Sequence, residues 1–329
     1  MRARMSRSIT SSTANAHAKP AARRNALPAR LSPGMACDTA FRIIARRHLD
    51  AVLAQHDGTC RGDPDALHQI RIALTHLRTA IRFFSPMVDD ARRPNVWAEL
   101  KWLNGQLGMV RDLDVAIERV VAESGDELAV IAELQHWDEK RAESHRLLAR
   151  ALQSARYRRL VEQTSMWIDS GPWSTRRSKE AIRLRRRTLA DHARERLTDW
   201  ETTLLKKARK LKRLDVARRH QLRLLNKRLT YSVESLADLF ADGAAAAKQK
   251  SMLKQLRKAQ RSLGQLNDDV RGQALASSLN GAVLDAGHRF LNRKREKKLL
   301  RTASVAYRKL DKTKRFRSSD LAPSSEPEV

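Results

Sequence analysis

The stretch LHQIRIALTHLRTAIRFF, residues 67–84, carries two stripes of side chains at helical spacing. One stripe is apolar and recurs at intervals of three and four residues, which is typical of a helix face buried in a core. Its members are Leu67, Ile70, Leu74, Leu77, Ile81 and Phe84. The other stripe lies one residue further along, about 100° around the helix, and consists of His68, Arg71, Thr75, Arg78 and Arg82. The pattern predicts a helix with a buried seam and a basic stripe beside it over roughly 21 Å.

The second half of the chain repeats this motif. RHQLRL at 219–224 matches LHQIRI at 67–72, and LGQLND at 263–268 matches LGMVRD at 107–112. Both matches come in the same order and at nearly the same separation, which predicts a tandem duplication of a helical unit, with pseudo-two-fold symmetry. The second basic stripe is shorter and consists of His220, Arg223 and Lys227, with Arg228 beside it. Lys101 and Arg257 occupy matching places, each two helical turns before the glycine of its LG motif.

Composition indicates a helical protein with an anionic partner. The 329 residues include 66 Lys and Arg against 37 Asp and Glu, a net charge of +29, and 41% hydrophobic residues are enough to build a core. Only 5% are aromatic and glycines number 12, which argues against a β-sandwich or a glycine-rich nucleotide-binding fold. Such an excess of positive charge predicts nucleic acid, an acidic membrane surface or another polyanion as partner. Residues 166–329 hold most of it, with 40 Lys and Arg against 18 Asp and Glu.

Helical periodicity runs through nearly all of the chain between two tails. We expect basic, disordered tails at 1–35 and 312–329 and an all-α domain at 36–311, with repeat one at about 36–165 and repeat two at about 175–311. The expected helices span about 37–55, 64–84, 95–107, 111–123, 126–153, 157–168, 179–211, 216–240, 245–263, 267–279 and 285–310. Breaks are expected at Gly108, at Gly264 and at Gly171-Pro172. No stretch reaches the roughly 20 apolar residues of a membrane span, and two cysteines without metal or disulfide spacing indicate a cytoplasmic protein.

These motifs resemble the CHAD family, the conserved histidine α-helical domain. The resemblance rests on His-x-x-Arg-(x)6-Arg from His68, on LGxxRDxDV from Leu107 to Val115, and on the segment from Arg156 through Trp173, which is similar to that family's linker. The motif from His220 to Tyr231 and LGxLND at 263–268 look like the family's second repeat. The resemblance covers about 36–311.

The resemblance implies two antiparallel helical bundles around a basic central groove or channel, binding of inorganic polyphosphate, and association with polyphosphate granules. Carried over residue by residue, the predicted polyphosphate-binding residues are His68, Arg71, Arg78, Arg82, Lys101, Arg111, His220, Arg223, Lys227, Arg228 and Arg257. Two departures from the family pattern are Thr75-His76, where relatives place two basic residues, and Thr230, where they place Arg. Either affinity is weaker, or His76 and Arg82 substitute.

Two residue types allow another interpretation. His68 and His220 could be metal ligands or phosphorylated nucleophiles, but no partner side chains at ligand spacing support a metal site, so we expect them to donate to phosphate or to orient a neighbouring Arg. As imidazolium groups they would make affinity depend on pH. Asp112, Asp114, Asp268 and Asp269 could act as acid and base, but we expect them to cap helix starts and to pair with basic neighbours.

The sequence thus predicts a non-enzymatic, polyphosphate-binding protein that needs no cofactor and no metal. The alternative is a nucleic-acid-binding or nucleoid-associated protein that uses its basic tails, although the chain shows no helix-turn-helix or zinc-finger pattern. A third alternative is an enzyme that acts on phosphoanhydrides. The dense basic runs 176–187, 206–213 and 293–298 are either solvated helix faces or a secondary polyanion-binding surface. Protein partners are not indicated.

Overall fold

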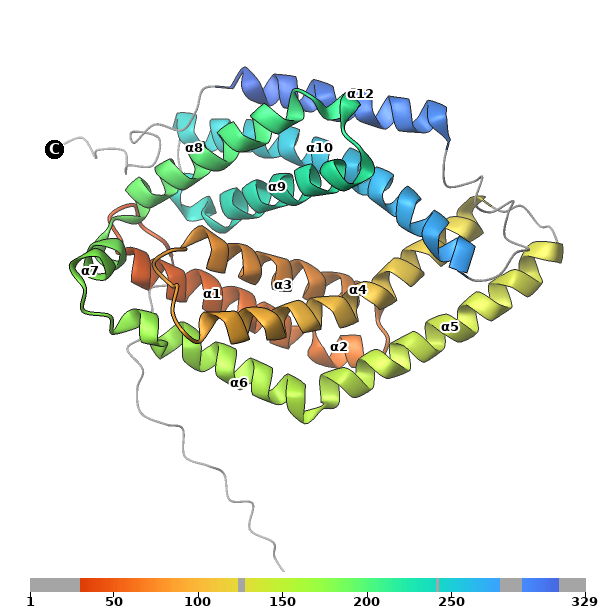
Figure 1. Ribbon diagram of the computed structural model, residues 1–329, viewed down its shortest axis with the longest axis horizontal. Coiled ribbons are helices and arrows are strands. Elements are labelled where there is room, and N and C mark those ends of the chain that lie inside the picture. Colours follow the sequence, from red (N-terminus) through yellow and green to blue (C-terminus); the bar gives the residue numbers. More distant parts are fainter. Residues whose placement is uncertain (1–29, 124–127, 241–242, 279–291, 314–329) are drawn as a thin grey trace, which may run out of the picture.

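The computed structural model describes residues 30–123, 128–240, 243–278 and 292–313 (Figure 1). Its α-helices are α1 (Cys37–Ala54), α2 (His56–Cys60), α3 (Pro64–Phe83), α4 (Arg93–Glu123), α5 (Leu128–Gln153), α6 (Ala155–Ser170), α7 (Lys179–Arg186), α8 (Leu189–Ala208), α9 (Val216–Ser235), α10 (Gly243–Ser278) and α12 (Arg293–Asp311). Short 3-10 helices are η1 (Pro172–Ser174), η2 (Leu211–Arg213) and η3 (Ala237–Phe240). Within these ranges the chain forms helices and no β-strand, so the predicted all-α class is confirmed.

The helices form two groups that meet along the middle of the molecule (Figure 1). One group contains α1 to α6, and the other contains α8, α9, α10 and α12, with α7 at the edge where the chain passes between them. Helix α3 contacts α9 across the boundary, and α4 contacts α10. The two helices that carry the predicted basic stripes therefore lie side by side, although they are far apart in the sequence.

Helix α3 forms as its sequence predicts. The Asp63 carboxylate accepts hydrogen bonds from the Asp65 and Ala66 amides, and Pro64 opens the helix, so the first turn is capped by side chain and by fixed φ. The apolar stripe is buried along its whole length, with no member more than 1% exposed, and it joins the main core: Leu67, Ile70, Leu74, Leu77, Ile81 and Phe84. The buried seam is therefore confirmed.

An aromatic cluster joins the segment after α6 to the core. The Phe41 ring packs edge-on against Trp167 and Trp173, with centroids 5.7 and 5.2 Å away. The Asp90 carboxylate accepts hydrogen bonds from the Trp167 indole and from the Trp173 amide. A Cβ atom at Gly171 would lie 2.6 Å from the Trp167 carbonyl oxygen, so only glycine allows the chain to turn here.

The expected breaks at the two LG motifs are wrong. Helix α4 continues through Gly108, and α10 continues through Gly264. A glycine inside a helix costs only about 1 kcal/mol relative to alanine, and packing against neighbouring helices offsets that cost. A Cβ atom at Gly108 would lie 3.4 Å from the Arg71 guanidinium, which is an ordinary contact, so Gly108 adjoins Arg71 without being required by it.

Two other expected helices are divided. The stretch 179–211 becomes α7, α8 and η2, because the Thr188 hydroxyl accepts from the Asp191 amide and caps a new helix. Helix α9 ends at Ser235, and η3 follows it. The N-terminal tail also ends earlier than expected, since Leu31 is 4% exposed and its amide donates to Asp238.

Several expectations lie outside the described residues. These are the expected tails, over 1–29 and 314–329, and the first residues of the last expected helix, 285–291. In the part of the chain that the structure describes, no helix combines the length and the apolar character needed to cross a membrane.

Candidate anion-binding site

Basic residues of α3 and α9 face each other where these two helices meet. Their pKa values are lowered by burial and by the charges of basic residues on α4 and α10. We call this set the central cation group; it consists of His68, Arg71, Arg111, Arg223, Lys227 and Arg271. Five of the six were predicted from the sequence, and they come from both halves of the chain.

Lys227 shows how unfavourable the electrostatics of this group are. Burial lowers the pKa of its ammonium from 10.5 to about 7, and the positive charges of Arg223 and Arg71 act in the same direction. Burial likewise lowers the pKa of Arg71 and of Arg223. Guanidinium groups stay charged even so, so Lys227 is the buried cation of the group whose charge responds to its surroundings near neutral pH.

Two carboxylates of the described residues, Asp112 and Asp268, act on the buried cations of this group, and each raises the pKa of more than one cation or pairs with a second one. Asp112 pairs with Arg271, and Asp268 raises the pKa of Lys227 without overcoming burial. Arg111 is already paired with Glu118, at 3.0 Å. The buried Nε of Arg223 has no hydrogen-bond partner among the described residues. Arg71 donates from Nη1 to the Leu107 carbonyl at 2.7 Å, which leaves its other nitrogens available. The geometry therefore gathers cations that a multivalent anion would stabilise.

His68 is exposed at the edge of this group. Burial of part of its ring, followed by the charges of Arg111 and Arg71, lowers its pKa. A neutral imidazole here can donate one hydrogen bond to a phosphate oxygen.

A second basic set lies further along α3 and α9. The guanidinium groups of Arg78 and Arg82 stack over the ring of Trp97, at 4.9 and 4.5 Å from its centroid. Burial, then the charges of Arg228 and Arg78, lowers the pKa of Arg82 to about 10. We call Arg78, Arg82 and Arg228 the Trp97 set. The indole face holds the α3 arginines in place by cation–π attraction, a contact that the sequence motifs did not predict.

Three predicted binding residues lie outside both sets. Arg257 forms two hydrogen bonds to Glu234, at 2.8 and 3.0 Å. His220 exchanges a hydrogen bond with the side chain of Asn267 at 2.8 Å. Lys101 is exposed on α4 and has no ion pair with another described residue. The partners found for His220 and Arg257 lie outside the central cation group, although His220 lies one helical turn before Arg223 on α9.

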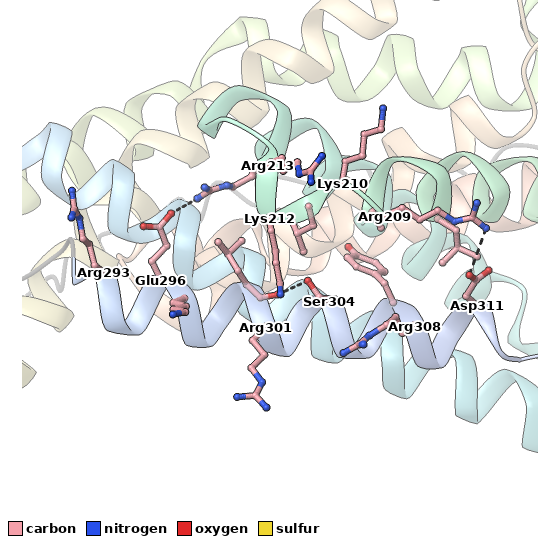
Figure 2. Close-up of a pocket in the computed structure, with 17 residues that line it drawn as sticks. Arg209, Lys210, Lys212, Arg213, Arg293, Glu296, Arg301, Ser304, Arg308 and Asp311 are labelled. Atoms are coloured by element: carbon pink, nitrogen blue, oxygen red, sulfur yellow. Dashed lines mark hydrogen bonds and ion pairs between the residues drawn. The ribbon is translucent and has the colours of Figure 1, made fainter.

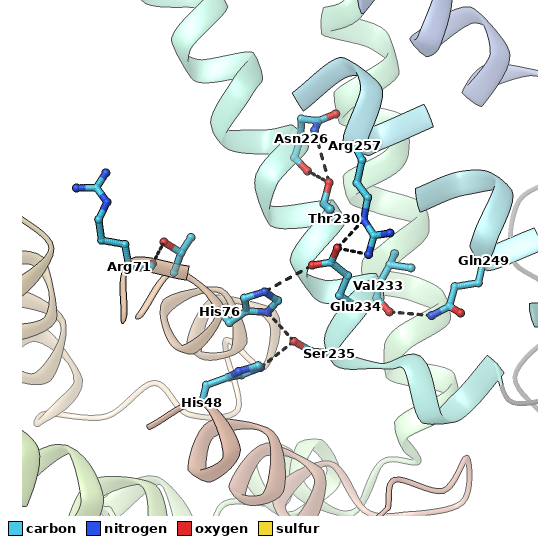
Figure 3. A network of polar contacts seen from close by, with 11 residues as sticks. His48, Arg71, His76, Asn226, Thr230, Val233, Glu234, Ser235, Gln249 and Arg257 are labelled. Carbon is cyan, nitrogen blue, oxygen red and sulfur yellow. Dashed lines mark hydrogen bonds and ion pairs between the residues drawn. The ribbon is translucent and has the colours of Figure 1, made fainter. Parts of the chain in front are cut away.

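The two departures from the family pattern have structural explanations (Figure 3). His76 is 9% exposed, its ring packs at a tilt against the rings of His48 and Tyr231, and it contacts Ser235 at 3.2 Å and Glu234 at 3.5 Å. Burial lowers its pKa to about 4. A neutral, buried imidazole cannot replace a phosphate-binding cation, so the expectation that His76 substitutes is wrong.

Thr230 is also buried. It is 1% exposed, and its hydroxyl donates to the Asn226 carbonyl at 2.8 Å (Figure 3). The Asn226 side chain is bound by the Leu256 carbonyl and by the Tyr307 hydroxyl. An arginine at position 230 would have to displace this network, so position 230 has a structural role in this chain.

The paired carboxylates after the LG motifs do not cap helices, because α4 and α10 are continuous through them. Three of the four, Asp112, Asp114 and Asp269, pair with basic neighbours, as expected. Asp112 binds Arg271, and Asp114, which is fully buried, lies 2.9 Å from Arg141 and 3.0 Å from His145. Over the described ranges, no three His, Cys, Asp or Glu side chains gather as a metal site would require.

Arg271 is the member of the central cation group that the sequence motifs did not indicate. It follows Asp268 by three residues on α10 and therefore lies on the same helix face. That spacing was the signal present in the sequence, because both residues lie in the helix expected at about 267–279, but the repeated motif ended at Asp268.

A family model for the CHAD domain matches residues 43–277 of this chain. The chain belongs to the CHAD family. The resemblance deduced from the motifs is thereby confirmed, and the family assignment covers most of the span from α1 to α10.

Two solved structures share the fold. The CHAD domain from the plant Ricinus communis has a TM-score of 0.71 at 24% identity, and the match covers 90% of this chain and 99% of that domain. PptA from Streptomyces chartreusis has a TM-score of 0.53 at 16% identity, with 85% and 99% covered. No curated protein gives a significant match.

Proposed function

We propose that this CHAD protein binds inorganic polyphosphate, without catalysis, and that the basic residues of α3 and α9 line a groove that holds it. The central cation group carries the proposal, because it holds four close cations from two halves of the chain against two neighbouring carboxylates of the described residues: Arg71, Arg223, Lys227 and Arg271. A linear phosphate chain has one negative charge on each unit and is flexible enough to follow such a row. The family resemblance points to the same ligand.

Both halves of the chain contribute equivalent residues in this proposal. Arg71 and Arg223 occupy matching places in the repeated motif and lie close enough for the charge of Arg223 to lower the pKa of Arg71. We infer that the motif arose by tandem duplication and that the two copies face each other across the groove with pseudo-two-fold symmetry. Arg71, Arg223 and Lys227 grip the phosphate chain, and the Trp97 set extends the basic row along α3.

The proposed absence of catalysis rests on the state of the carboxylates beside the groove. Asp112 is bound by Arg271, and Asp114 is buried between Arg141 and His145. Carboxylates held in this way are poor general bases. Incubation of polyphosphate with the protein and Mg²⁺ should release no phosphate above the uncatalysed rate, and steady release would contradict the proposal.

Binding should be strongly salt-dependent, because it exchanges the ligand's counterions for protein cations. The test is a competition titration of long-chain polyphosphate against double-stranded DNA of matched charge, at several salt concentrations. We expect polyphosphate to displace DNA at every concentration. Equal or tighter DNA binding would instead support the nucleic-acid alternative.

The matched variants for this titration remove equal charge in different places. Arg71→Glu with Arg223→Glu should weaken polyphosphate binding at least 100-fold, which corresponds to about 1.4 kcal/mol for each tenfold loss. Arg158→Glu with Arg159→Glu makes the same change in net charge on exposed residues of α6 and should weaken binding only by the small, general effect of net charge. Equal losses in both variants would contradict the groove. Association with polyphosphate granules follows from the same proposal and can be followed with a fluorescent fusion of both variants.

A further inference from the structure

A second basic site lies away from the groove, between the end of α8, η2 and α12 (Figure 2). It is a cleft of about 1000 Å³. Its cationic lining residues are Arg209, Lys210, Lys212, Arg213, Arg219, Arg293, Lys297, Arg301 and Arg308. The acidic ones are Glu296 and Asp311. The two basic runs 206–213 and 293–298, which the proposed groove does not use, thus come together in the fold.

The two carboxylates leave most of this charge uncompensated. Glu296 pairs with Arg219, and Asp311 lies 3.7 Å from Arg209. The other seven cations are exposed and form no ion pair with any residue in the described ranges. The cleft therefore has a large unbalanced positive charge, and like charges at this spacing repel one another unless an anion lies between them.

The shape of the cleft indicates an elongated ligand. Arg293, Lys297, Arg301 and Arg308 recur at intervals of one or two turns along α12, over roughly 22 Å of helix. Lys212 extends from η2 toward α12, whereas Lys210 and Arg301 extend outward on opposite sides (Figure 2). A single phosphate would need cations that converge on one point, whereas cations in a row fit a ligand with repeated charges.

The lining also indicates what the ligand lacks. The aromatic side chain in the cleft, Tyr307, is only 3% exposed, and its hydroxyl donates to Asn226. Leu211 and Leu300, beside it, are buried as well. Bound single-stranded nucleic acid typically stacks its bases on exposed aromatic rings, and among its described lining residues this cleft presents no such ring. Charge without a stacking surface favours a bare phosphate chain.

We propose that the α8–η2–α12 cleft is a second binding site for linear condensed phosphate, separate from the α3–α9 groove. Chains too short to reach both sites would occupy them independently. A long chain held in both would be bound by two linked contacts, which raises affinity beyond that of either site alone. The cleft proposal rests on residues that the groove proposal does not use, so each can fail separately.

The test is calorimetric titration of the full chain with tripolyphosphate at low salt. The cleft variant carries Lys212→Ala, Lys297→Ala and Arg308→Ala, which are exposed residues whose loss leaves the core intact. The control carries Arg158→Ala, Arg159→Ala and Arg177→Ala, three exposed cations elsewhere. We expect two sites in the wild type and in the control, and one site in the cleft variant.

Each other outcome has a definite meaning. If the cleft variant keeps the wild-type number of sites and their affinities, the cleft proposal is overturned. If the wild type has one site and only the cleft variant loses it, the cleft proposal stands and the groove proposal fails. A single-stranded DNA oligonucleotide of matched charge forms the second arm. Tighter binding of DNA than of polyphosphate, lost in the cleft variant, would overturn the assignment of the ligand.

Discussion

Lys227 should make polyphosphate binding depend on pH. Its pKa is about 7 in the free protein, because burial and the neighbouring Arg223 and Arg71 oppose its charge, only partly offset by Asp268. A polyanion in the groove reverses this balance and raises the pKa toward its ordinary value of 10.5. Between those two values the free protein is mostly deprotonated at Lys227 and takes up one proton on binding. Affinity should therefore fall about tenfold for each pH unit from roughly pH 7 to pH 9.

The variant that tests this mechanism is Lys227→Arg. A guanidinium keeps its charge throughout this range, so the variant should bind nearly as tightly at about pH 9 as at about pH 7. Fluorescence titration with long-chain polyphosphate, at constant ionic strength, measures both proteins; long chains have few titrating end groups for each bound unit. His68 and Arg271, two further members of the central cation group beside Lys227, are the same in both proteins. The reasoning is refuted if the wild type shows no pH dependence or if Lys227→Arg shows the same slope.

The same pKa shift predicts an effect on stability, and its sign follows from linkage. Three further changes test Arg223, the Trp97 ring contact and the hydrogen bond of Tyr307. The unfolded chain holds the Lys227 proton more tightly than the folded one, so protonation favours unfolding, and stability falls as pH drops from about 10.5 to 7. At about 1.4 kcal/mol for each pKa unit, the full shift amounts to about 5 kcal/mol, which is an upper limit because water screens a partly buried ammonium. Lys227→Met should therefore raise the midpoint of denaturant unfolding near pH 7 in the absence of ligand, and a midpoint that falls instead would show that the cation group is not strained. Arg223→Met should raise the free energy of unfolding by about 1 kcal/mol while it weakens polyphosphate binding, because the change removes a buried cation with an unpaired Nε; a fall in stability would contradict this. Trp97→Ala should cost about 2 kcal/mol in urea unfolding, since the indole holds two stacked arginines, and Trp97→Phe should cost less; equal costs would exclude the ring contact. Tyr307→Phe should cost about 1 to 2 kcal/mol, since it leaves the Asn226 side-chain oxygen without this donor in the buried network; thermal unfolding measures it, and an unchanged Tm would contradict it.

Particular elements show where the sequence was sufficient. The two stripes of α3 could be predicted from the sequence, because a helix that packs on one face repeats its apolar residues about every 3.6 positions. The start of α3 at Asp63-Pro64 could also be predicted, because both residues stabilise the first helical turn directly beside them in the sequence. The breaks at Gly108 and Gly264 were wrong for the opposite reason. Glycine weakens a helix only slightly, and whether the helix continues depends on the packing around it, which local sequence does not record.

The candidate site also combines residues that the sequence predicted correctly with residues whose surroundings it did not predict. The repeated motif was enough to single out Arg71 and Arg223, but it gave equal weight to His220 and Arg257, which the structure pairs with Asn267 and Glu234. The motif also suggested His76 as a substitute cation, although burial keeps that imidazole neutral. Asn267 and Glu234 each lie on a different helix from the side chain that they bind. Their positions near His220 and Arg257 therefore follow from how the helices pack.

By itself, the sequence determined the helical class, the buried face of α3 and the excess of positive charge, because these depend on composition and on periodicity within one segment. Only the tertiary structure decided which charges act together. It placed α3 beside α9, gathered Lys227 with arginines from both halves of the chain, and brought two separate basic runs to one cleft. The physical reason is that charges interact through distance in space and through burial, and neither quantity is set by position along the chain.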